Sequence, residues 1–234
     1  MGKRDDSRAR IEAQIIDVGR RHLVTDGPAG LSLRAIAREL GMVSSAVYRY
    51  VASRDNLLTL LLVDAYSELA DRVNSARAGR DAPWQENLLA IAVAARNWAI
   101  SAPARWALLY GSPVPGYHAP AEQTVIPGTR VVQAIFDTVA EGIAAGAITM
   151  ADHPAPLPLS RDLDGLRAEF GFDGDDDLLM RSVTMWAGMV GAISLEVFGQ
   201  YGPDTFTDPG VVFSTQIGLL IDLIAAPPAN GRSN

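Results

Sequence analysis

Residues 31–51, with the sequence LSLRAIARELGMVSSAVYRYV, constrain the fold more than any other stretch of this chain. Apolar side chains recur at helical spacing over residues 33–40, and Ser32 stands just before them, where a hydroxyl caps a helix. Gly41 follows, at the point where a helix end needs a residue that tolerates positive φ. This part of the stretch predicts a short helix that ends in a tight turn.

A second short helix is expected after the turn. Ser44 or Ser45 can open it, and Val47 and Val51 lie four residues apart, which places both on its inner face. Its outer face then carries small polar groups, a guanidinium and two phenols, from Ser45, Ala46, Tyr48, Arg49 and Tyr50. Such side chains suit a helix that lies in a DNA groove. Two helices around a glycine turn also occur in ordinary bundles, so the spacing alone leaves both interpretations open.

The distribution of charge favours DNA binding over a plain bundle. Residues 1–54 carry ten basic and six acidic side chains, a net charge of +4. Residues 55–234 carry ten basic and 21 acidic side chains, a net charge of −11. A cationic segment on an anionic remainder is typical of a DNA-binding module attached to another domain.

The first quarter of the chain resembles the DNA-binding domain of TetR-family transcriptional regulators. A helix over 11–24 precedes the two short helices, and residues 54–58, RDNLL, match the family's entry into a fourth helix. The other matching positions are Gly27, Ser32, Leu33, Ile36, Ala37, Leu40, Gly41, Val47, Tyr48 and Tyr50. Val43 departs from the pattern by replacing the Ser or Thr that caps the recognition helix, and Val51 replaces a larger Phe. Either Ser44 caps one residue late, or the cap is weak.

These positions supply a set of candidate DNA contacts. We expect Arg34 and Ser45 to contact bases or to lie next to them. Four further side chains are expected to bind phosphates and to fix the register, namely Ser32, Tyr48, Tyr50 and Arg54. Ser44 and Arg49 complete the predicted DNA-binding set.

Helical spacing continues beyond this segment and predicts an all-α protein of about nine or ten helices. We assign residues 1–54 to a three-helix helix-turn-helix DNA-binding domain and residues 55–230 to an antiparallel helical bundle for ligand binding and dimerisation. The longer helices are expected near residues 9–25, 53–78, 86–101, 128–146, 178–201 and 211–225. Breaks rich in Gly or Pro are expected at 26–30, 79–83 and 111–120, and the segment 151–177 should be irregular.

An acidic run, Asp173 and Asp175–Asp177, ends that irregular segment. It lacks the alternating ligands and the terminal Glu of a calcium-binding EF-hand loop. We therefore interpret it as the solvated N-terminus of the next helix, where negative charge is favourable. The sequence predicts neither a metal site nor a cofactor.

The two C-terminal helices, about 178–201 and 211–226, are the most apolar, and they are predicted to form a homodimer face. Ala187 and Gly191 are small residues four apart, which allows close approach of another helix, within the core or across subunits. A dimer face would bury on the order of 1,000–2,000 Å². Dimerisation is favoured because one short helix reads too few base pairs, whereas paired helices one DNA turn apart read a palindrome.

The second half of the chain resembles the regulatory domain of a TetR subgroup named for a Trp-His-Gly motif. The resemblance rests on residues 109–117 and on the pattern of Trp186, Gly191, Leu195, Glu196, Phe198 and Gly199, with Val190 at the position of the motif's His. It implies a ligand cavity in the helical bundle, closed in part by the loop before Tyr117. We expect a small, mostly apolar or aromatic effector, with His118 and Arg96 as possible polar contacts. The ligand-binding candidates are Trp98, Trp106, Tyr110, Tyr117, His118, Phe136, Trp186 and Met189, although such residues are more often plain core.

The expected function is a ligand-responsive transcriptional regulator, a repressor that its effector releases from operator DNA. No cysteine, HExxH motif, phosphate loop or nucleophile elbow is present, so an enzyme is not expected. The charged N-terminus lacks a signal peptide's apolar segment, and Arg181 and Glu196 interrupt the longest apolar stretch, which together suggest a soluble, cytoplasmic protein. A helical scaffold that binds proteins or small molecules without DNA is the remaining alternative.

Overall fold

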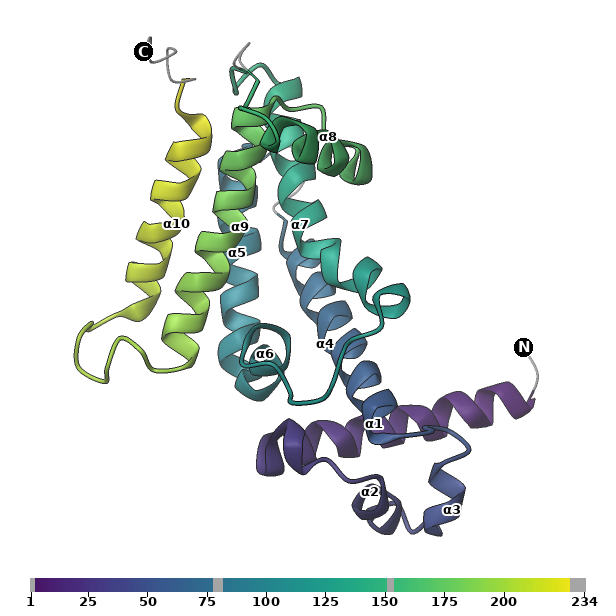
Figure 1. Ribbon diagram of the computed structural model, residues 1–234. Helices are drawn as coiled ribbons and strands as arrows, with labels where there is room; N and C mark the ends of the chain where they lie inside the picture. The colour runs from purple at the N-terminus through teal and green to yellow at the C-terminus, as the bar shows by residue number, and fades with distance from the viewer. Residues whose placement is uncertain (1–2, 78–81, 151–153, 228–234) are drawn as a thin grey trace. The chain divides into compact units, whose positions relative to one another are not determined.

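The computed structural model describes residues 3–77, 82–150 and 154–227 and is all-α over these ranges (Figure 1). Within them lie ten helices, in agreement with the predicted fold class. The helices are α1 (Lys3–Gly30), α2 (Leu33–Glu39), α3 (Ser44–Val47), α4 (Arg54–Ala76), α5 (Trp84–Ser101), α6 (Pro103–Tyr110), α7 (Ala121–Ala144), α8 (Leu159–Phe170), α9 (Asp176–Val197) and α10 (Pro209–Ala225). The predicted break at 79–83, the start of the irregular segment at 151–153 and the predicted domain end at 230 lie wholly or partly outside the described residues.

The chain divides into two compact units. The first unit comprises Met1–Glu68 and Ala102–Gly128, and the second comprises Leu69–Ser101 and Thr129–Asn234. The first unit thus contains α1 to α3, most of α4, all of α6, the loop that follows α6 and the start of α7. The predicted division at residue 54 is a division by function, and the division by contacts does not test it.

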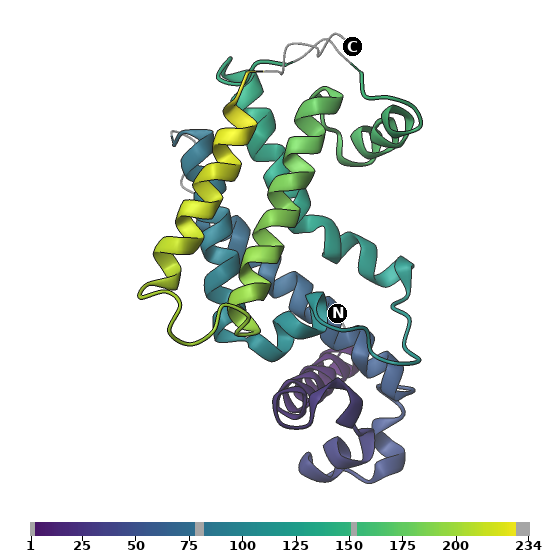
Figure 2. The same ribbon diagram turned by 60° about the vertical axis from the view of Figure 1, so that its left-hand side comes forward.

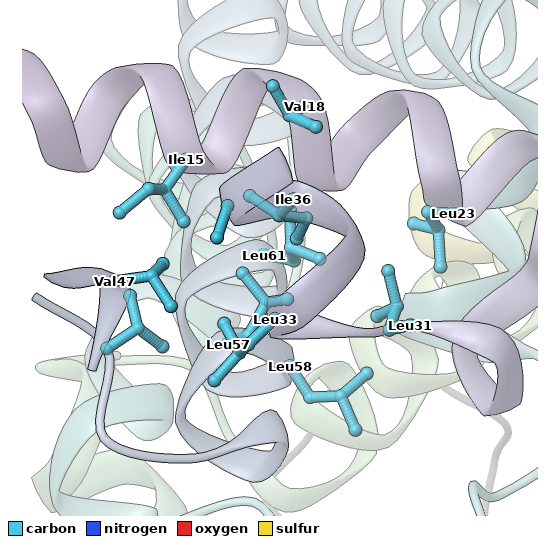
Figure 3. Close-up of a cluster of buried hydrophobic side chains, with 12 residues drawn as sticks. Ile15, Val18, Leu23, Leu31, Leu33, Ile36, Val47, Leu57, Leu58 and Leu61 are labelled. Atoms are coloured by element: carbon cyan, nitrogen blue, oxygen red, sulfur yellow. The ribbon is translucent and has the colours of Figure 1, made fainter. Parts of the chain in front are cut away.

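A hydrophobic core holds the first four helices of the first unit together (Figure 3). Its buried side chains are Ile15, Val18, Leu23, Leu31, Leu33, Ile36, Ala37, Val47, Val51, Leu57, Leu58 and Leu61. Val47 and Val51 lie fully inside, as their spacing predicts. Because one face of α2 and of α3 is buried in this core, the opposite face of each helix is left toward solvent.

The turn between α2 and α3 has the predicted chemistry. Ser32 caps α2, and its Oγ accepts a hydrogen bond from the backbone N–H of Ala35 at 3.4 Å. Gly41 has a φ of +66°, which suits glycine better than any residue with a Cβ. Val43 is the N-cap of α3 and provides no side-chain cap, so the weak-cap alternative is confirmed.

Two segments near the recognition helix differ from the sequence-based expectation. The second short helix was predicted to reach Val51, but α3 ends at Val47 and turn hydrogen bonds continue the chain, such as the one from Tyr50 N to Val47 O at 3.0 Å. A four-residue helix without a cap is held by packing rather than by its own propensity. The predicted break at 26–30 is a kink within α1, where Gly27 has a φ of 67° just before Pro28.

Helix α6 and the following loop pack against the core of the first unit. Ala104, Leu108, Val114 and Tyr117 are partly buried against it. The Tyr117 hydroxyl lies 2.9 Å from Thr59 Oγ1 of α4, within hydrogen-bond distance. The predicted irregular loop at 111–120 is therefore attached to the same core as the two short helices.

In the second unit, α10 packs against α9 and α5, and α8 packs against α9. Figures 1 and 2 both show α9 and α10 side by side. Phe136 of α7 lies against Phe170 and Phe172, each with ring centroids 5.1 Å away. Arg96 of α5 forms a bidentate ion pair with Glu196 of α9. The Arg96 Nε lies 2.7 Å from Oε2, and its Nη2 lies 2.5 Å from Oε1.

The sequence-based prediction did not include all of these helical residues. α7 begins at Ala121, seven residues before the predicted start, although it contains Pro127. α8 occupies part of the segment that was expected to be irregular, since the prolines that suggested a loop lie before it. Gly171, with a φ of 61°, ends α8 as a left-handed cap.

The acidic run is the N-terminus of α9, as predicted. Asp175 caps the helix by accepting from the Leu178 N–H at 2.8 Å. Asp176, however, is buried rather than solvated, and its carboxylate accepts from Arg167 Nη1 at 2.6 Å and from the Ala155 N–H at 2.7 Å. The hydrogen bond from Arg167, with a smaller contribution from Ala155, lowers the pKa of Asp176 below its ordinary value.

Because this pKa is lower in the folded protein, ionised Asp176 stabilises the fold above the unfolded pKa of about 3.9, and the contribution is lost as the pH falls below that value. We expect Asp176→Asn to destabilise the protein at pH 7 and to flatten the decline of stability as the pH falls below about 4. Urea unfolding at several pH values measures this. Asp173→Asn, at an exposed position, is the matched control. An unchanged pH dependence in Asp176→Asn would contradict the assignment.

Candidate nucleic-acid interface

The outer face of α2, α3 and the turn after α3 carries most of the predicted DNA contacts. Arg34, Ser44, Ser45 and Arg49 are exposed, and Tyr48 is 43% exposed. Gly41 and the buried Val47 orient this surface by fixing the turn and anchoring α3. These five side chains are thus free to reach a ligand from one helix-turn-helix element.

Three other predicted contacts are partly engaged within the protein. Ser32 caps α2. Tyr50 is half-buried, and the Arg8 guanidinium lies 5.8 Å from the centre of its ring. Arg54 donates from Nη2 to the carbonyl oxygen of Pro28 at 2.8 Å, which ties the start of α4 to the end of α1.

The arginines of the first unit fall into a paired group and a free group. Acidic side chains hold Arg8, Arg20, Arg21 and Arg105. By contrast, four arginine side chains have no ion pair or hydrogen bond to another described residue, namely Arg10, Arg34, Arg38 and Arg49. Three of these four lie on α2 or directly after α3. Uncompensated positive charge therefore lies at the helix-turn-helix surface, where it can neutralise DNA phosphates.

A surface hollow of about 620 Å³ lies at this turn. It is lined by Arg34, Arg38, Met42, Val43 and Ser44. Arg38, Met42 and Val43 were absent from the predicted DNA-binding set. The position of Arg38, one helical turn after Arg34, could have identified it from the sequence, because residues four apart share a helix face. No sequence signal revealed that Val43 would be exposed.

Four of the predicted ligand-binding residues belong to the first unit. Trp106 is buried and lies against Tyr110, with ring centroids 4.4 Å apart. Tyr117 is engaged with Thr59, and His118 is exposed. The structure thus brings Trp106 and Tyr110 together and places Tyr117 against the core of the helix-turn-helix element.

The other four belong to the second unit. Trp98, Phe136 and Met189 are buried, and Trp186 is half-buried with an indole N–H that meets no acceptor among the described residues. Arg96, a suggested polar contact for the effector, is instead paired with Glu196. A surface hollow of about 840 Å³ in this unit lies around Arg167 and Asp176 and includes none of the predicted ligand-binding residues in its lining.

Comparison with known proteins identifies both halves of the chain. Residues 15–61 match the family described as bacterial regulatory proteins, tetR family, and residues 88–220 match the tetracyclin repressor-like C-terminal domain. The HTH-type transcriptional regulators Rv1816 of Mycobacterium tuberculosis and Mb1846 of Mycobacterium bovis are each 62% identical over 226 residues, which is 96% of this chain and 97% of theirs. The solved structure of the putative regulatory protein SCO4313 is similar with a TM-score of 0.76 and 31% identity, over 94% of this chain and 100% of that one.

The fold and the free cationic face define a helix-turn-helix DNA-binding protein. The chain belongs to the tetR family of bacterial transcriptional regulators. It is therefore a ligand-responsive DNA-binding regulator and not an enzyme. The further assignment to the Trp-His-Gly subgroup stays a prediction.

Proposed function

We propose that this protein is a dimeric repressor in which residues 1–54 bind a palindromic operator and residues 55–230 bind the effector and the second copy. The proposal rests on Arg34, Arg38 and Arg49, which lie on the outer face of the helix-turn-helix element and have no ion-pair partner among the described residues. When such arginines neutralise DNA phosphates, the DNA releases its condensed counterions, which favours binding and supports DNA as the partner. Such a regulator acts where the chromosome is, and we therefore expect it in the cytoplasm.

Within this proposal, Arg34 and Ser45 lie at or near base edges, and Tyr48 and Arg49 bind phosphates with Ser44. Their exposure supports these roles. Ser32, Tyr50 and Arg54 are proposed to make secondary phosphate contacts at the edge of this surface. Each already has a partner within the protein that fixes its position. A random pool of duplex DNA tests the proposal, since the protein should enrich one palindromic sequence.

Arg34→Ala tests the division between base and phosphate contacts. A guanidinium that binds a guanine contributes about 1–3 kcal/mol of discrimination against the wrong base. We therefore expect the variant to lose that discrimination at one position of each half-site, measured by fluorescence anisotropy with operator variants. Arg72→Ala is the matched control, because Arg72 of the second unit is exposed and forms no ion pair within the part of the chain that the structure describes. An equal loss for every sequence would make Arg34 a phosphate ligand instead.

The dimer is proposed to form through the outward faces of α9 and α10. Large apolar side chains are exposed on both helices, namely Leu195, Val211, Leu219 and Leu223, with Phe198 just after α9. Ala187 and Gly191 are exposed on α9, and a Cβ built at Gly191 meets no atom within 4 Å, so a second helix has room to approach there. A second copy is the proposed occupant because a palindrome needs two recognition helices.

By length and composition alone, α9 could also cross a membrane. α9 has 22 residues and a mean hydropathy of 1.4 in its most apolar window, of which 39% is buried. The charged side chains Arg181 and Glu196 of α9 both have partners in the second unit. Arg181 contacts Asp177 and the carbonyl oxygen of Leu223, and Glu196 contacts Arg96. These contacts and the packing of α10 support a helix of a folded bundle.

The effector is proposed to be small and mostly apolar. Trp98, Phe136 and Met189 are buried, and the indole N–H of Trp186 meets no acceptor in the described ranges. These side chains support an apolar effector with at least one hydrogen-bond acceptor. A related fold, FadR from Bacillus subtilis, was solved in complex with stearoyl-CoA, with a TM-score of 0.61 and 12% identity. A thermal-shift screen of apolar acids, alcohols and aromatics tests this, because a ligand raises the melting temperature and should release the operator.

A further inference from the structure

Val43 stands out on the helix-turn-helix surface because it is a large apolar side chain among cations. It is 71% exposed in the free protein. Its backbone is extended, with a φ of −68° and a ψ of 139°, and it precedes α3 without capping it. The side chain therefore neither packs in the core nor stabilises the helix end.

The surroundings of Val43 restrict what could cover it. It shares a hollow of about 620 Å³ with Arg34, Arg38 and Ser44, and neither arginine is paired with a described residue. A protein or lipid surface that covered Val43 with apolar groups alone would leave these two guanidiniums desolvated without partners, which is unfavourable. The edge of a DNA duplex instead offers acceptors and phosphates beside the arginines.

Among the base edges of the major groove, the thymine methyl group is the one that matches an isolated apolar side chain. In the major groove, thymine presents a C5-methyl group, whereas the other base edges present hydrogen-bond donors and acceptors. The neighbouring Arg34 and Ser44 supply the polar contacts that adjacent bases and phosphates need. Val43 thus adds a kind of contact that the polar residues of the surface cannot make.

We propose that Val43 is a specificity-determining residue that contacts the C5-methyl group of a thymine in each operator half-site. The inference rests on the proposed function and names one base contact of the same surface. Burial of one methyl group corresponds to about a four-fold change in affinity for each half-site, and to about 15-fold for two half-sites of a dimer. Valine at this position therefore selects a T·A pair over a C·G pair at one position of each half-site.

A thymine-to-uracil series tests the contact, because uracil removes the methyl group and keeps the base pairing. The duplex is the palindrome enriched from a random pool, and anisotropy measures the affinity of the protein and of Val43→Ala for each uracil substitution. We expect one symmetric pair of thymines at which uracil weakens the unaltered protein about 15-fold and Val43→Ala less than about two-fold. Val24→Ala, which changes a valine of the same unit that is 70% exposed, should respond to uracil as the unaltered protein does.

Val43→Ser separates this role from a structural one. Serine can cap α3, so a purely structural role predicts a variant that is as stable and as selective as the unaltered protein. A thymine contact predicts instead a stable variant that no longer distinguishes thymine from uracil. An enriched half-site without thymine, or equal uracil effects in the unaltered protein and Val43→Ala, would overturn the inference while leaving DNA binding intact. A pool without any enrichment would overturn the proposed function, and this inference with it.

Discussion

Leu219→Glu is expected to convert the protein into monomers and to abolish tight operator binding. Leu219 is 66% exposed on α10, so a glutamate there should be tolerated within a single chain. In the proposed dimer, each copy would bury an unpaired carboxylate, and a buried unpaired charge costs about 3–5 kcal/mol. The dissociation constant of the dimer should therefore rise more than about 100-fold.

Sedimentation velocity at micromolar concentration measures this change directly. The operator affinity should fall with it, because separate monomers lose the advantage of binding two linked half-sites. Ile126→Glu is the matched control, since Ile126 is 77% exposed on α7 and lies outside the proposed dimer face. A Leu219→Glu protein that remains dimeric would place the interface elsewhere.

Asp64→Ala is expected to produce the second large effect, a loss of folding stability in the first unit. Asp64 of α4 accepts from Arg20 of α1, with Oδ1 2.5 Å from Nη2, and from Arg105 of α6, with Oδ2 2.9 Å from Nη2. The hydrogen bond from Asp64 also raises the pKa of Arg20 above its ordinary value. One carboxylate therefore joins three helices of the unit.

Removing that carboxylate leaves two arginines without this partner, and the side chain of Arg105 is only 10% exposed. The expected loss is about 2–4 kcal/mol, which is below the value for a fully buried pair because Arg20 is partly solvated. Urea unfolding followed by circular dichroism measures it. Asp71→Ala is the control: Asp71 pairs with Arg130 at 2.6 Å with its side chain 67% exposed, and its loss should cost less than about 1 kcal/mol. Equal effects of the two substitutions would show that the Asp64 network contributes little.

The sequence predicted the helix-turn-helix element well because local signals agree there. The spacing of Leu33, Ile36 and Val47, the cap at Ser32 and the positive φ at Gly41 all act within a few residues. Such signals need no knowledge of the rest of the fold. The same reasoning located α9 and α10, whose ends differ from the predicted ends by only a few residues.

Features that depend on distant contacts could not be predicted in this way. Arg54 looked available for phosphate, but the carbonyl of Pro28, 26 residues earlier, accepts from it. Arg105 and Asp64 are 41 residues apart, and Arg96 and Glu196 are 100 residues apart, so no spacing rule pairs them. Tyr117 illustrates the same point, because its hydroxyl lies 2.9 Å from the hydroxyl of Thr59 on α4, 58 residues earlier.

In the proposed function, two copies of the cationic α2–α3 surface bind one DNA duplex. The most direct measurement is sedimentation of the protein with its enriched duplex, at ionic strengths from about 50 to 300 mM. We predict two chains per duplex and an association constant whose logarithm falls linearly with the logarithm of salt concentration, by about 0.9 per phosphate contacted. A protein that stays monomeric and binds no duplex of any sequence at the lowest salt would contradict this mode of DNA binding.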